Sequence, residues 1–463
     1  MTLLSDAARE YARAHGEQFR QELHEMLRIP SLSADPAHAG DVRRMAEWLA
    51  DHFNSLGLDK VAVMETAGHP VVYGEWTGAG PDKPTVLVYG HYDVQPAEMK
   101  DGWSTDPFVP VRKEGNLFAR GATDDKGQLF THIKSLEAVI NVFGKLPLQV
   151  KYLIEGEEEV GSENLYDQLP KLRDKLACDI VVISDTCQYG PGQPAITYGL
   201  RGICSYELKV TGAATDLHSG TFGGVVANPL LAVCQMMAGL KDADGKITVP
   251  GFYDDVDSLT ERERGRLRAL DFDEQSFMDK LGVEALPGEA GYTPLERKWA
   301  RPSFDVHGLL GGYQGEGSKT VLPCAGGAKF SFRLVPHQDP EKVTAGITKR
   351  LAELCPPGVK YELIERGMAQ AVVVPIDSPY VTAAVEAIEK GFGRSPVFIR
   401  EGGSIPIVLA FKQELGADTL LLGWGLDDDN AHGPDEKFSL SDFHRGIRAS
   451  AALWTTLSGV SKS

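Results

Sequence analysis

The sequence has little of several features that would each point to a particular class of protein. Its six cysteines form no CxxC pair and no regular spacing, so they do not indicate a disulfide framework. No hydrophobic run approaches the ~18 residues that a membrane-spanning helix needs. No internal repeat or low-complexity segment stands out. We therefore expect a protein of the reducing cytoplasm, whose cysteines are small buried apolar residues. They are Cys178, Cys187, Cys204, Cys234, Cys324 and Cys355.

Positive charge is also in short supply. The chain has 47 basic and 65 acidic residues, which gives a formal net charge of -18. This balance argues against nucleic acid or an anionic membrane as a partner, and it leaves carboxylates available for divalent cations. Residues 1–20 form a charged amphipathic pattern and do not resemble a signal peptide. At 463 residues the chain is longer than a single hydrophobic core usually accommodates, which favours two domains.

The first part of the chain alternates between strand and helix patterns. Alternation of this kind predicts an α/β domain with a mostly parallel sheet. In such sheets, sites form at the carboxyl ends of the strands. The predicted helices are 6–28, 40–56, 127–143 and 163–175, and the predicted strands are 71–76, 85–90, 149–155 and 179–184.

The pattern changes near Cys204. Residues 205–210 and 329–335 alternate strictly between apolar and polar, as half-exposed antiparallel strands do. A helix over 229–240 and a charged, poorly periodic region over 242–301 lie between them. The α/β pattern returns in helix 380–392, strand 419–422 and helix 442–457. The sequence thus predicts a catalytic domain (1–205 and 376–463) interrupted by an α+β domain (206–375), with a hinge and a cleft.

Acidic and histidine residues gather in five clusters at strand ends or in glycine-rich turns. Taken singly, each has an ordinary explanation: a helix cap, a solvated acidic surface, a turn residue or a surface histidine. Together, two histidines and three carboxylates at one sheet edge match a two-metal site bridged by one carboxylate. Mixed nitrogen and oxygen ligands suit Zn²⁺, with Mn²⁺ or Co²⁺ as substitutes. The clusters hold His91 and Asp93; Asp124 and Asp125; Glu155 to Glu159; Asp185; and His432.

At this point the sequence resembles the M20 family of metallopeptidases, in particular its carnosinase-like dipeptidase branch. The matching motifs extend from His91 to Glu436 and are specific in combination. They are GHYDVQP, GATDDKG, EEVGS, ISD, DLHSG, EGGSIP and NAHGPDE. The resemblance implies a zinc-peptidase-like catalytic domain and an inserted domain that serves as lid and dimer interface.

The resemblance also implies a set of metal ligands. Asp124 would bridge two metal ions. His91 and Asp185 would complete one site, and Glu159 and His432 would complete the other.

Further roles follow from the same motifs. Glu158 would be the general base, and Asp93 would orient His91. The peptide bond between Asp124 and Asp125 would be cis. Because Glu157 adds a third acid to the motif, the register is anchored on Gly161 and Ser162.

In the inserted domain, the resemblance points to three places. His218 resembles a histidine that reaches into the partner's site and stabilises the oxyanion; otherwise it is a loop or core histidine. Arg333 resembles a residue that binds a substrate carboxylate, or it forms a surface ion pair. Gly403 and Ser404 lie in a loop resembling one that contacts the substrate's C-terminal end, or in a plain turn.

These expectations combine into a di-metal hydrolase that cleaves dipeptides or other short peptides with a free C-terminal carboxylate. The alternative within the same family is an N-acyl amino acid deacylase or desuccinylase. A non-catalytic protein that keeps the fold is disfavoured, because every ligand and the base are present. We further expect a homodimer formed through the lid domain, with no nucleic-acid or membrane partner.

Overall fold

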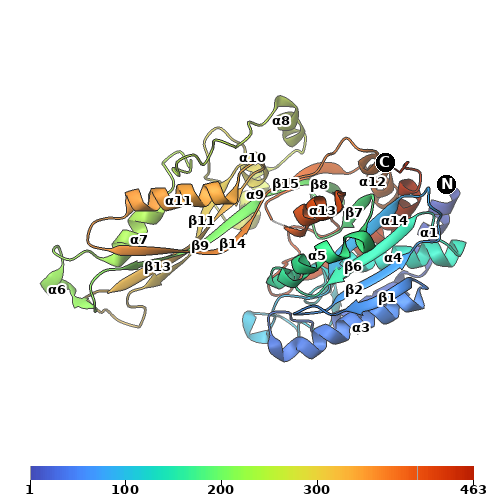
Figure 1. Ribbon diagram of the computed structural model, residues 1–463, viewed down its shortest axis with the longest axis horizontal. Coiled ribbons are helices and arrows are strands. Elements are labelled where there is room, and N and C mark those ends of the chain that lie inside the picture. Colours follow the sequence, from blue (N-terminus) through green and yellow to red (C-terminus); the bar gives the residue numbers. More distant parts are fainter. Residues whose placement is uncertain (1, 404, 463) are drawn as a thin grey trace. The chain divides into compact units, whose positions relative to one another are not determined.

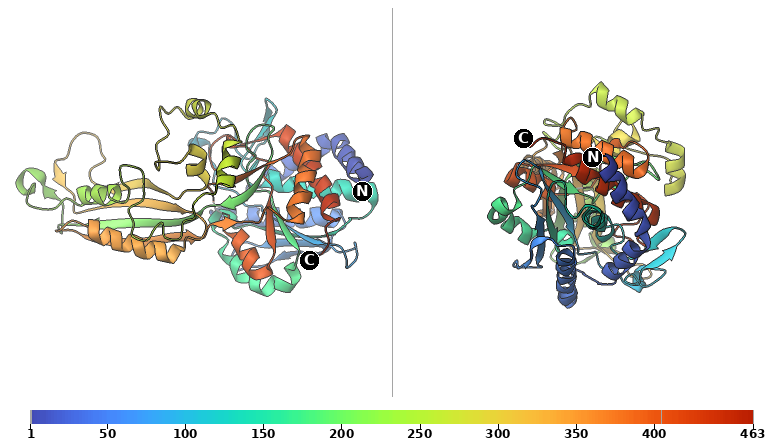
Figure 2. Two further views of the ribbon diagram at one scale, coloured as in Figure 1. Left: turned by 90° about the horizontal axis from the view of Figure 1, so that it is seen from above. Right: turned by 90° about the vertical axis from the view of Figure 1, so that its right-hand side faces the viewer.

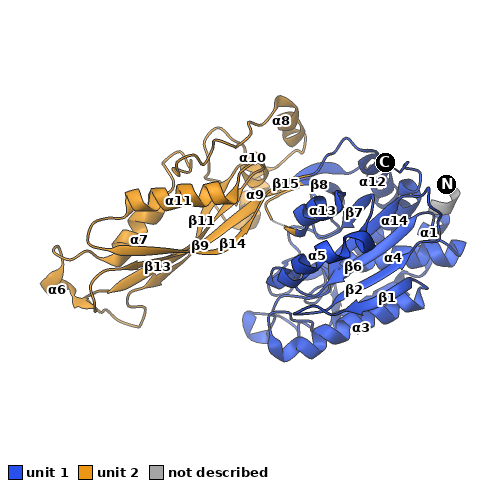
Figure 3. Ribbon diagram, viewed as in Figure 1, with its two compact units in different colours: residues 1–198, 374–399, 407–463 blue, residues 199–373, 400–406 orange. Residues whose placement is uncertain are grey.

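The computed structural model describes residues 2–403 and 405–462, which form two compact units (Figure 3). Unit 1 comprises residues 1–198, 374–399 and 407–463, and unit 2 comprises residues 199–373 and 400–406. The boundaries predicted from the sequence, 205/206 and 375/376, lie a few residues away, and residues 400–406 are an addition to the predicted inserted domain. Within the described residues, no helix is both long and apolar enough to cross a membrane.

The largest sheet has nine strands in the order β1-β2-β6-β3-β7-β17-β8-β15, with β16 also paired to β8. Its centre is parallel: β3 pairs in parallel with β6 and β7, and β7 with β17. Antiparallel strands flank this centre. The expected α/β class is therefore confirmed. The strands are β1 (Asp59–Met64), β2 (Val71–Trp76), β3 (Thr85–His91), β6 (Gln149–Glu155), β7 (Ile180–Ile183), β8 (Ala195–Leu200), β15 (Val372–Val373), β16 (Val397–Glu401) and β17 (Asp418–Leu421).

Helices cover both faces of this sheet, so its central strands are apolar on both sides (Figures 1 and 2). On β3, Val86 and Val88 join the core beneath one helical layer. Tyr89 points the other way and packs edge-on against Phe411. The first layer consists of α1 (Thr2–Ala14), α2 (Gly16–Leu27), α3 (Ala39–Ser55), α4 (Lys126–Phe143), α12 (Pro379–Phe392) and α14 (Leu440–Leu457); the second consists of α5 (Glu163–Leu176) and α13 (Ile407–Leu415).

Two sequence predictions need correction. The single helix expected over 6–28 is two helices, because the chain leaves helical geometry at His15, just before Gly16. All six cysteines are free, but only Cys204 is buried, and the expectation for the others is wrong. Cys234 is exposed because helix α7 (Pro229–Ala238) turns Val233, Met236 and other apolar side chains toward the core instead.

Unit 2 contains a four-stranded antiparallel sheet in the order β11-β13-β9-β14. Strand β9 alternates between buried and more exposed residues, as predicted. Its Tyr206 packs with Phe330 and Phe332 in the core of this unit, beneath α7 and α11. The elements are β9 (Gly202–Thr211), β11 (Ser303–Gly311), β13 (Ala325–Leu334), β14 (Lys360–Ala369) and α11 (Pro340–Leu354).

Short elements complete both units. The charged region 242–301 carries three short helices, each started by a side chain that accepts a backbone N–H: Thr260, Asp273 and Thr293. Unit 1 adds a three-stranded sheet, β18-β5-β4. The bounds are α6 (Ser219–Phe222), α8 (Glu261–Arg268), α9 (Glu274–Leu281), α10 (Pro294–Trp299), β4 (Val111–Lys113), β5 (Asn116–Phe118), β10 (Leu217–His218), β12 (Val321–Leu322) and β18 (Lys437–Ser439).

Candidate metal centre

The carboxyl ends of three parallel strands bring the acidic and histidine clusters together. His91 ends β3, Asp185 follows β7, and Glu159 lies in the turn after β6. Asp124 precedes α4, and His432 comes from the loop between β17 and β18. These side chains form two groups that could each hold an ion, and Asp124 belongs to both.

Distances within the two groups are short. The Nε2 atom of His91 lies 3.1 Å from Asp124 Oδ1 and 4.0 Å from Asp185 Oδ2. On the other side, His432 Nε2 lies 2.9 Å from Asp124 Oδ2 and 3.2 Å from Glu159 Oε2. Asp124 thus presents one oxygen to each group, as a bridging carboxylate would.

Asp93 is buried and touches both strand ends. Its Oδ1 lies 3.4 Å from His91 Nδ1, and its backbone oxygen is 3.1 Å from the same nitrogen. Its carboxylate also accepts the backbone N–H groups of Glu158 (3.3 Å) and Glu159 (3.1 Å). Asp93 can therefore orient His91 while holding the turn that carries the two glutamates.

The three consecutive glutamates have different surroundings. Glu157 accepts the backbone N–H of His69 and the side-chain amide of Asn164, each at 3.0 Å. Glu159 belongs to the second ligand group. The charges of His91, Glu159 and Asp124 act on the carboxyl group of Glu158. The Asp124–Asp125 peptide bond is cis, as the resemblance implies.

Burial and close contact between charged groups shift the pKa values of the residues at this centre. Burial, reinforced by the negative charge of Asp124, raises the pKa of Asp185 well above its usual range. Burial, with help from Glu159, raises the pKa of Glu158 to about 7. Hydrogen bonds to Asp124 and Glu159 raise the pKa of His432 to about 10.

The donor set fits divalent cations. Each group offers one imidazole nitrogen and two carboxylates, the mixed ligation that Zn²⁺ and its substitutes accept. The raised carboxyl pKa values mark a pocket that lacks positive charge, which a bound cation would supply. The residues at this sheet edge therefore fit the metal ions that the sequence implies.

The remaining predicted site residues lie in unit 2. His218 is exposed and its Nδ1 accepts the N–H of Gly220 at 3.0 Å. Arg333 is half-buried on β13, and burial lowers the pKa of its guanidinium. Gly403 follows β16, whereas Ser404 lies outside the described residues.

Several polar residues in or near the site had no role assigned from the sequence. Gln95 donates its side-chain amide to Glu159 Oε2 at 2.8 Å, which fixes that ligand oxygen. Arg201, half-buried in unit 2, donates Nε to Gly402 O at 3.3 Å beside the predicted substrate loop. Glu436 accepts several hydrogen bonds from the loop that holds Asp124. Gln95 and Glu436 could have been noticed in the sequence, because each is a polar residue without an assigned role inside a motif, GHYDVQP and NAHGPDE respectively.

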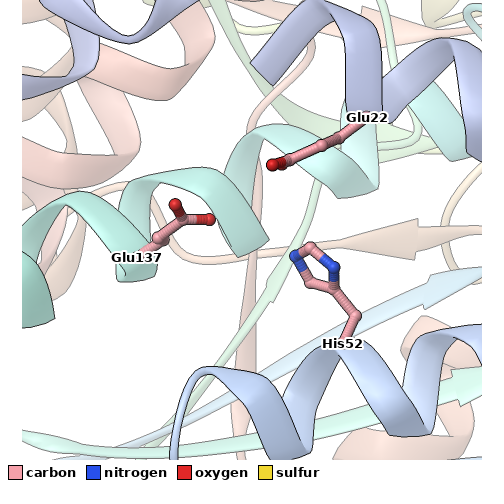
Figure 4. Close-up of side chains that lie close together, drawn as sticks. All are labelled: Glu22, His52 and Glu137. Atoms are coloured by element: carbon pink, nitrogen blue, oxygen red, sulfur yellow. The ribbon is translucent and has the colours of Figure 1, made fainter. Parts of the chain in front are cut away.

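A third group of possible ligands is of a different kind. Glu22, His52 and Glu137 point toward one another from α2, α3 and α4 (Figure 4). The ammonium of Lys134, which the figure does not draw, lies 2.9 Å from His52 Nε2 and 2.6 Å from Glu137 Oε2, and it pairs with Glu22. A protein cation already fills this group, so it is an ion-pair cluster and not a metal site.

Comparisons with known proteins agree with this geometry. Residues 87–456 match the model of "Peptidase family M20/M25/M40". A "Cys-Gly metallodipeptidase dug1" of Schizosaccharomyces pombe is 35% identical over 461 residues, covering 96% of each chain. A "Beta-Ala-His dipeptidase" of Homo sapiens is 34% identical, covering 96% of this chain and 91% of that one. The crystal structure of human carnosine dipeptidase 1 has a TM-score of 0.87 at 33% identity and covers 99% of both chains.

An α/β sheet with a parallel centre, and two ligand groups that share one carboxylate at its edge, define a metal-dependent hydrolase. The chain belongs to peptidase family M20. It is a metallopeptidase similar to dipeptidases over nearly its whole length, and the comparisons do not favour the deacylase alternative.

Proposed function

We propose that this protein hydrolyses the peptide bond of dipeptides and other short peptides that have a free C-terminal carboxylate. The observation that carries the proposal is the pair of ligand groups joined at Asp124, with the Glu158 carboxylate in the same charged cluster. The curated relatives named above are dipeptidases, which supports a small peptide as substrate.

In this proposal two divalent ions occupy the two groups. Asp124 is shared, His91 and Asp185 complete one group, and Glu159 and His432 complete the other. Zn²⁺ suits these ligands best, and Mn²⁺ or Co²⁺ could replace it. When bound, the ions polarise the scissile carbonyl and acidify the attacking water.

Glu158 acts as the general base. It accepts a proton from the water as the new C–O bond forms, and it returns that proton to the amine as the C–N bond breaks. The charges of His91, Glu159 and Asp124 all act on its carboxyl group, so it lies beside both ligand groups, which supports this role. Asp93 orients His91 through the contact between its carboxylate and His91 Nδ1.

The residues of unit 2 have roles in substrate binding. Arg333, Gly403 and Ser404 hold the free carboxylate, which restricts the enzyme to short substrates. His218 stabilises the oxyanion in the site of a partner subunit, so the enzyme acts as a homodimer formed through unit 2.

Exposed apolar side chains on unit 2 support the homodimer. Strand β11 is at the edge of its sheet, and it exposes Val306, Leu309 and Leu310. Leu231 on α7 is 62% exposed. An unpaired edge strand with apolar side chains is typical of an interface. The six free cysteines support a reducing cytoplasm as the location.

The test is hydrolysis of a panel of dipeptides, tripeptides and N-acyl amino acids by metal-stripped protein, with Zn²⁺ or Mn²⁺ added back. We expect metal-dependent cleavage of dipeptides and none without metal. Cleavage of acyl amino acids alone would contradict the proposed substrate while keeping the metal chemistry. Peptide cleavage that survives complete metal removal would contradict the mechanism.

A further inference from the structure

A buried carboxylate near the end of the chain holds the loop that carries Asp124. Glu436 is fully buried, and its Oε1 accepts the backbone N–H groups of Thr123 (2.9 Å) and Asp124 (3.1 Å). Its Oε2 accepts the N–H of Gly121 and Nη1 of Arg120, both at 2.9 Å. Four donors therefore converge on one side chain, which fixes the position of the loop backbone at Asp124.

Arg120 extends this arrangement to the other side of the centre. Its Nη2 donates to the backbone oxygen of His432 at 3.2 Å and to that of Pro96 at 3.4 Å. Its guanidinium also stacks 5.1 Å from the ring of Trp103. The ion pair thus ties together the segment of Asp124, the segment of His432 and the end of the segment that begins at His91.

Stability alone does not account for such a pair. Taking two opposite charges out of water costs about as much as their attraction returns, and apolar side chains of similar size often stabilise a fold as well. What an ion pair adds is direction, because each of its hydrogen bonds fixes an angle and a distance. Here those directions determine how far His432 lies from Asp124, whose Oδ2 is 2.9 Å from its Nε2.

We propose that Arg120 and Glu436 are positioning residues that set the spacing between Asp124 and His432 and thereby the affinity of the metal centre. The inference rests on the proposed function, since it takes Asp124 and His432 as ligands. Glu436 acts on the shared carboxylate and so on both groups. Arg120 supports Glu436 through Nη1, and through Nη2 it also holds the backbone oxygen of His432, which belongs to one group alone.

The experiment is a titration of metal-free protein with Zn²⁺ against a competing chelator. In Glu436→Gln an amide N–H₂ replaces an acceptor oxygen and faces other donors, so both ions should bind ~10–100-fold more weakly. Arg120→Lys keeps the charge but loses the fork that reaches His432, so only one of the two binding steps should weaken. Excess Zn²⁺ should restore the activity of Arg120→Lys.

Two further variants sharpen the test. Asp435→Asn is the matched control, because the partly exposed carboxylate of Asp435 accepts hydrogen bonds from Ser104 N and Oγ and not from the loop of Asp124. It should bind both ions as the wild type does. In a His432→Ala background, Arg120→Lys should have no further effect, since the step that it weakens is already lost.

Circular dichroism checks that the metal-free variants fold. If Glu436→Gln does not fold, the metal titration of Arg120→Lys still tests the inference. Folded variants that bind both ions with wild-type affinity would overturn the inference. So would an equal loss in Asp435→Asn, or an added loss in the His432→Ala background. A wild-type protein that binds fewer than two ions would instead overturn the proposed metal centre, and the inference with it.

Discussion

At the scale of single residues, neighbouring acids in the chain have separate partners. Glu157 is held by His69 and Asn164, and Glu159 faces His432. Glu158, between them, has its pKa raised to about 7 by burial and by the surrounding carboxylates. Three identical side chains in a row thus have three different surroundings, because the turn after β6 points each of them in its own direction.

The first prediction concerns the proposed base. Glu158→Ala should lose at least ~10² in turnover, because no other group takes the proton, yet it should keep its metal. Steady-state kinetics and the bound-metal content check both. Glu163→Ala, at the exposed first residue of α5, is the control and should remain active. More than ~1% of wild-type turnover in Glu158→Ala would show that another group is the base.

The protonation of His52 should affect the free energy of unfolding. Burial, and then the nearby Lys134 ammonium, lower the pKa of His52 to about 4, against about 6.5 when unfolded. Between these values the unfolded chain binds a proton that the folded chain does not. The free energy of unfolding should therefore fall as the pH drops from about 6.5 to about 4, by roughly 3 kcal/mol in total.

The second prediction tests this dependence. In His52→Gln the side-chain oxygen can still accept from Lys134, but the titrating group is gone. Its unfolding free energy should change less between about pH 7 and about pH 4.5 than that of the wild type. Denaturant unfolding at both pH values measures the difference, and His337→Gln, on the surface of unit 2, is the control. Identical slopes in His52→Gln and wild type would contradict the assignment.

At the scale of elements, the site depends on how closely helix α4 approaches the loop before it. Gly127 lies in the first turn of α4, and a Cβ there would be 1.9 Å from the backbone oxygen of Ala122. The same Cβ would be 2.9 Å from Phe438. A larger residue must therefore push the loop of Asp124 away from the helix.

The third prediction compares two helical glycines. Gly127→Ala should destabilise unit 1 by ~1–3 kcal/mol through overpacking, and it should also weaken metal binding. Gly265→Ala in α8 meets open space and should instead stabilise its helix, by up to about 1 kcal/mol. Thermal unfolding and metal titration of both variants check the pair. If both substitutions had equally small effects on stability and metal binding, the close approach at Gly127 would not matter for the site.

The same scale shows what the sequence could predict. Strands β2 and β6 coincide with the predicted 71–76 and 149–155, because buried apolar runs between turn signals are distinctive. His91 and Asp185 come together because parallel strands end at one edge, and Asp124 reaches them from the loop before α4. The Arg120–Glu436 pair could not be found in this way. Its residues are 316 positions apart, and no local pattern encodes such a contact. Nor could the sequence reveal that Lys134 fills the Glu22–His52–Glu137 group.

At the scale of the whole molecule, the two units are interleaved in the sequence. Unit 1 is assembled from three separate stretches, and unit 2 is inserted between them. The proposed chemistry extends this dependence further, since His218 would act in the site of a partner subunit. Activity would then be a property of the dimer and not of one chain.

The fourth prediction tests this shared site. His218→Ala and Glu158→Ala should each be inactive as pure proteins. When they are unfolded together and reassembled, mixed dimers should regain part of the wild-type activity, because one site per dimer combines an intact Glu158 with an intact His218. Activity is measured against the fraction of mixed dimers. Inactive mixtures that contain proven mixed dimers would show that His218 does not act across subunits.

The order of the ligands along the chain has a consequence for synthesis. His91, Asp124, Glu159 and Asp185 leave the ribosome early, but His432 and Glu436 come only after the whole of unit 2. With the ligands as proposed, a growing chain carries an incomplete centre until these last segments dock against the first ones. A peptidase with these ligands would stay inactive while unit 2 is being made and could become active only after His432 has been added.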